Sequence, residues 1–299
     1  MKCGRLSLTR RGNLTGKVVV ITGAAAGIGE ATARQLVAEG ARVALIDRDD
    51  VSVQRVAASL GEPAAAFVAD VCDAAAVDRT MSLILNHFGG IDVVVANAGI
   101  VGPVATFAAM GADAFEQVIE VNVLGAARTV RAALPSVVQR HGYVLVIASA
   151  AAAIPTPTIA AYGVSKAGAE ALGRSLRMEL TDTGATAGVA YFGLIDTGMV
   201  RNDLLGGSGL EAVLAPLPKW FREPAPVEEA ARAIVAGIKA RARWVSAPRY
   251  LPVLLALRTT IALAEPLLAR SAGLRAAIRQ ANRVGRQESR SQEVATGPI

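Results

Sequence analysis

The feature that most constrains the fold of this 299-residue chain is an apolar run followed by a glycine-rich turn and a helical stretch. The run Val18-Val19-Val20-Ile21 is β-branched and typical of a buried strand. The turn Thr22-Gly23-Ala24-Ala25-Ala26-Gly27-Ile28-Gly29 follows, and a helical pattern then extends from Glu30 to Glu39. Such glycines let a backbone approach a pyrophosphate, whose negative charge a helix N-terminus favours. Taken alone, they also fit an ordinary tight loop between a strand and a helix.

Strand and helix patterns alternate along most of the chain. We expect strands at Val18–Thr22, Arg42–Asp47, Ala64–Ala69, Asp92–Ala96, Tyr143–Ser149, Ala187–Phe192 and Trp244–Ala247. The helices expected between them include Ala74–His87, Ala114–Arg140 with a break near Pro135, Ala161–Asp182 and Val227–Arg241. This alternation predicts an α/β fold, a Rossmann-like doubly wound parallel sheet of about seven strands with helices on both faces. Ligands of such sheets bind in a crevice at the carboxyl ends of the strands.

An acidic residue ends the second predicted strand. Asp47 lies about twenty residues beyond the glycine turn, where a carboxylate can accept hydrogen bonds from an adenine ribose. The same carboxylate repels a 2′-phosphate, so we expect NAD as the cofactor and leave NADP open.

A tyrosine and a lysine stand four residues apart within Ala161-Tyr162-Gly163-Val164-Ser165-Lys166. On a helix these positions share one face, so the Lys166 ammonium can lie beside the Tyr162 phenol. A neighbouring cation favours the phenolate and so lowers the pKa of a tyrosine. Ser149 lies thirteen residues upstream at the end of an apolar run, and it can donate a hydrogen bond to the same substrate oxygen. The pattern predicts proton transfer to and from a substrate oxygen, although chance spacing on an amphipathic helix is the alternative for Tyr162 and Lys166 alone.

Several motifs in register resemble the short-chain dehydrogenase/reductase family over roughly residues 14 to 248. They are the TGxxxGxG turn at Thr22–Gly29, the Asp70-Val71 pair and Asn97-Ala98-Gly99. The resemblance implies a catalytic tetrad of Asn122, Ser149, Tyr162 and Lys166, in which Asn122 holds a water that relays protons from Lys166. An asparagine that only packs a helix is the alternative for Asn122.

The resemblance also implies which residues contact the cofactor. They are Gly23, Ala26, Gly27, Ile28, Gly29, Asp47, Arg48, Asp70, Val71, Asn97, Ala98, Gly99, Tyr162, Lys166, Gly193, Ile195 and Thr197. In the family, a basic residue after the second strand can accompany NADP, as Arg48 would here, whereas Ala26 lacks the basic group that many NADP-dependent members carry in the turn. Phe192 stands where the family usually has proline, so we expect the loop rigidity and the shape of the nicotinamide-side wall to differ from the family pattern.

The segment from Asp196 to Pro226 is rich in apolar residues and corresponds to the family's mobile lid over the substrate. Its large apolar residues are Met199, Leu204, Leu205, Leu210, Val213, Leu214, Leu217, Trp220 and Phe221. An apolar lid predicts a lipophilic alcohol or ketone as substrate. Packing of the lid onto the fold or into an oligomer interface is the alternative. A homodimer or homotetramer is expected.

The two ends of the chain carry its basic character. Residues 1–17 hold five basic side chains and no acid, and residues 249–299 hold eight arginines against three glutamates. We therefore divide the chain into a basic N-terminal segment (1–17), one catalytic domain (18–248, with the lid at about 196–226) and an apolar, then basic, helical extension (249–299). The extension is a poor transmembrane span, because Arg258, Glu265 and two prolines interrupt it. It could touch an anionic membrane, cover a neighbouring subunit or fold back on its own.

Other classes of site and location are disfavoured. Cys3 and Cys72 are too few for a disulfide framework and are not spaced as metal ligands. We expect a cytoplasmic protein, either free or peripheral to a membrane. No nucleic-acid-binding motif accompanies the positive charge, and the N-terminus lacks the apolar core of a signal peptide. A nucleotide sensor or scaffold that has lost catalysis is the rival hypothesis, and the presence of all four tetrad residues argues against it.

Overall fold

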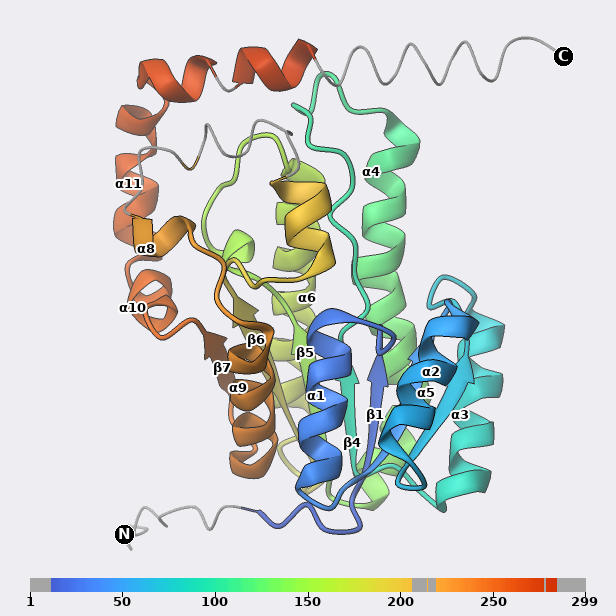
Figure 1. Ribbon diagram of the computed structural model, residues 1–299. Coiled ribbons are helices and arrows are strands. Elements are labelled where there is room, and N and C mark those ends of the chain that lie inside the picture. Colours follow the sequence, from blue (N-terminus) through green and yellow to red (C-terminus); the bar gives the residue numbers. More distant parts are fainter. Residues whose placement is uncertain (1–11, 206–213, 215–218, 277, 284–299) are drawn as a thin grey trace, which may run out of the picture.

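Seven parallel strands form one sheet with helices on both of its faces in the computed structural model (Figure 1), which describes residues 12–205, 214, 219–276 and 278–283. The strands are β1 (Val18–Thr22), β2 (Arg42–Asp47), β3 (Ala64–Val68), β4 (Val93–Ala96), β5 (Tyr143–Ile147), β6 (Thr186–Phe192) and β7 (Trp244–Ala247). Their order across the sheet is β3-β2-β1-β4-β5-β6-β7, with every neighbouring pair parallel. The doubly wound fold predicted from the sequence is confirmed.

The two faces of the sheet bury separate hydrophobic cores. On β1, Val19 and Ile21 pack into one core, and Val18 and Val20 into the other, because successive side chains of a strand point to opposite faces. One core is covered by α1 (Gly27–Ala38), α2 (Asp50–Leu60) and α9 (Val227–Ala240), and the other by α3 (Ala74–Phe88), α5 (Ala126–Gln139) and α6 (Ala160–Glu179). Burial on both faces explains why the strands are apolar without alternation.

The helical stretch expected between Ala114 and Arg140 is continuous, and the predicted break near Pro135 is wrong. Pro135 lies inside α5 and is exposed, so the carbonyl that its missing N–H would have bonded can be hydrated by solvent. The irregularity lies earlier in the stretch. α4 (Ala112–Ile119) passes into a π-helical turn, Glu120–Gly125, before α5 begins. Asn122 is at this turn.

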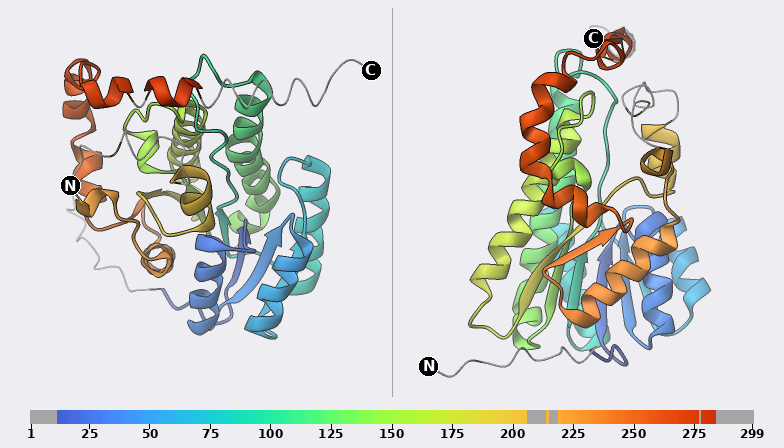
Figure 2. Two further views of the ribbon diagram at one scale, coloured as in Figure 1. Left: turned by 45° about the horizontal axis from the view of Figure 1, so that its top comes forward. Right: turned by 90° about the vertical axis from the view of Figure 1, so that its left-hand side faces the viewer.

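The described part of the C-terminal extension folds back on its own chain. α10 (Leu251–Ala256) places Leu251 in a small core with Tyr191 of β6, and α11 (Arg258–Leu268) follows it. Residues 272–276 and 278–283 are helical and cross the end of the molecule where the strands have their carboxyl termini (Figure 1; Figure 2). Within the described residues, every helix is too short or too polar to cross a membrane.

Candidate active site

The glycine turn after β1 is tied to the end of β4 by Asn97. The Asn97 side-chain amide donates hydrogen bonds to the carbonyl oxygens of Thr22 (2.9 Å) and Gly23 (3.0 Å). In return, the Thr22 hydroxyl oxygen accepts hydrogen bonds from the backbone N–H groups of Asn97 (3.1 Å) and Ala98 (3.2 Å). Asn97 therefore shapes the turn.

The turn leaves no room for larger side chains. A Cβ added to Gly29 would lie 2.1 Å from the Gly23 carbonyl oxygen, and Gly23 itself has φ of +67° and lies against Ala98. α1 begins directly after Ala26, which caps it without a side-chain hydrogen bond. First-turn N–H groups without a side-chain cap are suited to a phosphate group. The backbone of this turn thus fits a dinucleotide.

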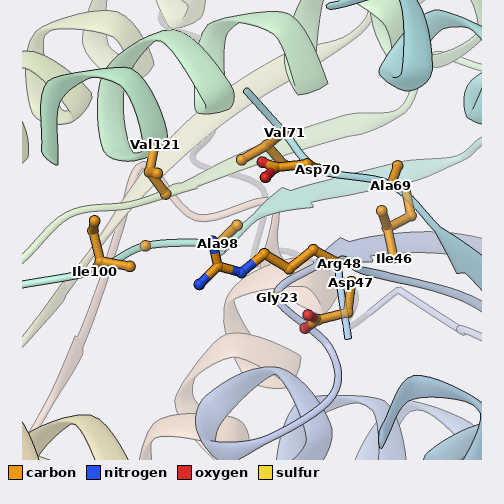
Figure 3. A pocket seen from close by; sticks show the side chains of 11 residues that line it. Gly23, Ile46, Asp47, Arg48, Ala69, Asp70, Val71, Ala98, Ile100 and Val121 are labelled. Carbon is orange, nitrogen blue, oxygen red and sulfur yellow. The ribbon is translucent and has the colours of Figure 1, made fainter. Parts of the chain in front are cut away.

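A cavity of about 180 Å³ lies beside the turn, at the ends of β2 and β4 (Figure 3). Its walls are formed by Gly23, Ile46, Asp47, Arg48, Ala69, Asp70, Val71, Ala98, Gly99, Ile100 and Val121. Seven of these residues were predicted as cofactor contacts, and Ile46, Ala69, Ile100 and Val121 were missed. Each of the four is adjacent in sequence to a predicted site residue, and that adjacency could have indicated them.

Asp47 and Arg48 project differently at this cavity. The Asp47 carboxylate turns toward the glycine turn, where it accepts a hydrogen bond from the Ala25 N–H (3.0 Å), while the exposed Arg48 side chain extends over the cavity (Figure 3). The second Asp47 oxygen accepts a hydrogen bond from the Asp49 N–H (3.1 Å). The carboxylate is fixed from two sides, and Arg48 brings a positive charge to the same opening.

Lys166 is buried beside Tyr162 on α6. Its ammonium donates a hydrogen bond to the Ile147 carbonyl oxygen (3.0 Å), at the end of β5, and lies 5.6 Å from the centre of the Tyr162 ring. Burial lowers the pKa of Lys166 to about 8, because a charged amine is poorly solvated there. The spacing of four residues places the two groups together as expected.

Ser149 is oriented between β6 and Tyr162. Its hydroxyl donates a hydrogen bond to the Phe192 carbonyl oxygen (3.2 Å), and its oxygen accepts one from the Ala151 N–H (3.2 Å). Burial raises the pKa of the Tyr162 phenol, and a hydrogen bond with Ser149 acts in the opposite direction. The expectation that Lys166 lowers this pKa is therefore not met by the chain alone, where burial is the larger effect. The neutral phenol that results is the form that donates a proton.

Asn122 joins the π-helical turn to two neighbouring segments. Its side-chain amide donates to the Ile100 carbonyl oxygen and to the Ser165 hydroxyl, and its carbonyl oxygen accepts from the Ile100 N–H, all at 2.8 Å. Ser165 in turn donates to the Tyr162 carbonyl oxygen (2.8 Å). The contacts are those of a packing asparagine, yet a Cβ placed on Gly99 would come within 3.1 Å of the Asn122 carbonyl oxygen and 3.3 Å of the Lys166 ammonium. The side chains of Asn122 and Lys166 thus both lie next to Gly99.

The segment after β6 lies close to the glycine turn. Ile195 is buried and pairs with Ala225, and a Cβ placed on Gly27 would lie 3.2 Å from the Thr197 methyl group. Phe192, in place of the usual proline, is buried in the core and supplies the carbonyl that holds Ser149. Gly193 follows and donates its N–H to the Ala247 carbonyl oxygen (3.0 Å).

The described lid residues gather around Tyr162. Val200 and Leu204 are buried in a cluster with Val101, Val104 and Ile159, and the partly buried side chains packed against this cluster include Tyr162, Leu194, Met199, Leu205 and Leu214. Phe221 lies instead against Tyr250, with ring centres 5.3 Å apart. The predicted lid residues Leu210, Val213 and Leu217 lie outside the described residues, as does the Trp220 side chain.

The short chain dehydrogenase family model matches residues 17–205. An uncharacterized oxidoreductase of Staphylococcus epidermidis is 34% identical over 193 residues, covering 64% of this chain and 83% of that protein. The 2,3-dihydro-2,3-dihydroxybenzoate dehydrogenase of Bacillus subtilis is 32% identical over 223 residues, covering 73% of this chain and 85% of that enzyme.

Two solved structures share the fold at 25% sequence identity. A 3-ketoacyl-(acyl-carrier-protein) reductase from Brucella melitensis, complexed with NADH, has a TM-score of 0.70 and covers 78% of this chain and 97% of its own. Levodione reductase has a TM-score of 0.72 and covers 80% of this chain and 99% of its own.

Proposed function

Because the chain belongs to the short-chain dehydrogenase family, we propose that it interconverts a secondary alcohol and a ketone with a nicotinamide dinucleotide. The observation that carries this proposal is the meeting of Ser149, Tyr162 and Lys166, with the Lys166 ammonium beside Gly99, a residue that lines the cavity at the glycine turn. The cofactor supplies or accepts the hydride. The protein's residues orient the substrate and move its proton.

In the proposed reduction, Tyr162 donates its phenolic proton to the ketone oxygen as negative charge develops there. Ser149 turns its hydroxyl from the Phe192 carbonyl to the substrate oxygen and stabilises the same charge. The Lys166 ammonium stabilises the phenolate that Tyr162 becomes and binds the ribose of the cofactor. Asn122, through its position beside Gly99 and Lys166, holds a water that returns the proton.

We propose NAD as the preferred cofactor and a lipophilic substrate. The fixed Asp47 carboxylate supports NAD, and Arg48 is the feature that favours NADP. The apolar cluster of lid residues around Tyr162 supports an apolar substrate. The names of the similar enzymes describe a cyclic diol, a ketoacyl group and a dione, so an acyl chain or a ring both fit this proposal. We propose a homodimer or homotetramer in the cytoplasm. Light scattering of the purified protein tests the oligomeric state, and fractionation of cells tests the location.

Oxidation of NADH by the purified protein, across a panel of short, cyclic and long-chain ketones, tests the proposed reaction. Turnover of at least one apolar ketone is expected. Tight NADH binding without turnover of any ketone would favour the rival nucleotide sensor or scaffold instead. NADPH in a parallel series tests the cofactor proposal.

A further inference from the structure

The last described helix has one apolar and one basic side. We call residues 271–276 and 278–283 the C-terminal strap. Leu274 and Ile278 are partly buried and Ala281 is fully buried, one turn apart along the inner side of the strap. The exposed outer side carries Arg275, Arg279 and Arg283, which also lie one turn apart. The inner side must therefore be covered by the chain itself.

Asn282 fastens the strap to the substrate side of the crevice. The Thr106 hydroxyl donates a hydrogen bond to the side-chain oxygen of Asn282. The residue before Thr106, Ala105, pairs with Ile159, which is buried in the same cluster as the lid residues around Tyr162. The strap is thus connected, through Thr106 and the neighbouring Ala105–Ile159 pair, to the apolar cluster that packs against Tyr162.

A second attachment holds the other end of the extension. Arg258, the first residue of α11, donates a hydrogen bond to the Glu170 carboxylate (3.1 Å). Glu170 is buried on α6, one turn beyond Lys166, and also accepts a hydrogen bond from Arg174 (3.0 Å). One attachment is thus made to α6 itself, and the strap crosses the end of the molecule where the strands have their carboxyl termini (Figure 1; Figure 2).

We infer that the C-terminal strap forms the outer wall of the substrate pocket and selects ketones with a long apolar tail. This inference rests on the proposed function. With its carbonyl at Tyr162, such a substrate extends past Val101 and Val104 toward the apolar inner side of the strap. Leu274 and Ile278 determine specificity in this arrangement, and Asn282 is a positioning residue that keeps the wall in place.

Kinetics with a long and a short ketone test the wall. In Asn282→Ala, kcat/KM for 2-dodecanone should fall by roughly threefold to tenfold, through a higher KM, since one hydrogen bond holds the wall. The kcat/KM for 2-butanone and the Kd for NADH should stay unchanged. Thr106→Ser, which keeps the hydroxyl, should behave as wild type, whereas Thr106→Val should resemble Asn282→Ala. Arg279→Ala, on the outer side, is the matched control and should change neither substrate.

Crosslinking tests the fastening without reference to activity. In full-length protein with Cys3→Ser and Cys72→Ser, cysteines introduced by Phe107→Cys and Arg283→Cys, at exposed positions next to the intact Thr106–Asn282 pair, should be joined within one chain by a short bis-maleimide. Each single-cysteine variant is the control.

The outcomes separate the two proposals. Reduction of no ketone by wild-type protein would remove the proposed function and the wall with it. If wild-type protein reduces both ketones, and Asn282→Ala changes kcat/KM equally for both or for neither, the proposed wall is ruled out and the proposed function stands. A crosslink that joins two chains instead of one would show that the strap covers a neighbouring copy and would overturn the inference.

Discussion

The Ala25 N–H and the Asp47 carboxylate are joined by a hydrogen bond of 3.0 Å, which fixes a negative charge beside the glycine turn. The other carboxylate oxygen is held by the Asp49 N–H. Since both oxygens are engaged by backbone groups, the charge cannot move away from a phosphate placed at the same strand end. The held carboxylate should therefore repel the 2′-phosphate of NADP wherever that phosphate lies at this strand end.

Asp47→Asn should therefore narrow the preference for NADH over NADPH by about tenfold, roughly 1.4 kcal/mol, because it removes the charge at nearly constant side-chain size. Its single oxygen can accept only one of the two backbone hydrogen bonds. Fluorescence titration with each cofactor measures the change. Asp49→Asn is the matched control, since that exposed carboxylate caps α2 through the Ser52 N–H (3.0 Å) and does not line the cavity. Tighter binding of NADPH than of NADH to the wild-type protein would contradict the proposed preference.

Tyr162→Phe should lower kcat by about two to four orders of magnitude, because it removes the proton donor. The Kd for NADH should change little. Tyr143→Phe is the matched control: that phenol donates a hydrogen bond to the Ala242 carbonyl oxygen (2.6 Å) and lies on the amino-terminal side of β5, away from the crevice. Steady-state rates of the two variants decide the assignment, and near-normal turnover in Tyr162→Phe would refute it.

The buried ammonium of Lys166 should make stability depend on pH in the alkaline range. Its pKa is lowered from 10.5 to about 8 in the folded chain, so the unfolded chain binds more protons between these two values. The free energy of unfolding contributed by this group should rise as the pH increases from about 8 to about 10.5, and it should stay constant below pH 8. Urea denaturation of the wild type and of Lys166→Met across this range isolates the effect, because other titrating groups cancel in the difference. A flat difference would show that the amine keeps its ordinary pKa.

Gly29→Ala should destabilise the protein by about 1–3 kcal/mol and weaken NADH binding, since the added methyl group would lie 2.1 Å from the Gly23 carbonyl oxygen. Gly273→Ala places a methyl group in open space on an exposed helix and should be neutral or slightly stabilising. Thermal unfolding compares the two. Equal melting temperatures would mean that the Gly23 backbone can move away from the added methyl group at little energetic cost.

The exposed arginines of the C-terminal strap should bind anionic membranes, which would bring the protein close to lipophilic substrates. Each arginine near such a surface contributes about 1 kcal/mol, and binding should weaken as salt screens the attraction. Sedimentation with phosphatidylserine-containing vesicles measures this, with phosphatidylcholine vesicles as the control. Replacing Arg275, Arg279 and Arg283 by Gln should abolish the binding. Failure of the wild type to sediment at low salt would exclude membrane contact through these residues.

The fold was predictable because its signals are local. Val18–Thr22, Arg42–Asp47 and Trp244–Ala247 are strands as expected, since β-branched runs bounded by turns are typical of buried strands. The break near Pro135 was placed wrongly because a proline rule assumes a buried or unsolvated carbonyl, and Pro135 is exposed. The π-helical turn has no signal in composition, and the hydrogen-bond partner of its Asn122, Ile100, lies on a segment 22 residues away.

The proximity of Tyr162 and Lys166 was predictable, because positions four residues apart share one face of a helix. The apolar walls of the candidate site were not, because Ile46 and Val121 carry no chemistry that sets them apart from the core. The path of the C-terminal extension was left among three alternatives for a related reason. An amphipathic pattern gives the side that will be covered but not the surface that covers it, and the bonds of Asn282 and Arg258 resolve this only in three dimensions.

The π-helical turn between α4 and α5 makes the packing of both helices depend on the number of residues in this stretch. A π turn contains one residue more than a regular α-helical turn, so everything after Gly125 is rotated by about 100° relative to an uninterrupted helix. That rotation lets α4 lie against α6 while α5 packs over β4. Removing one residue here, such as Leu124, would restore a regular α-helix. It would also rotate α5 relative to α4, so that one of the two helices would no longer present its apolar side to its present neighbour. The stretch is therefore far less tolerant of a single-residue deletion than of a substitution on its exposed side.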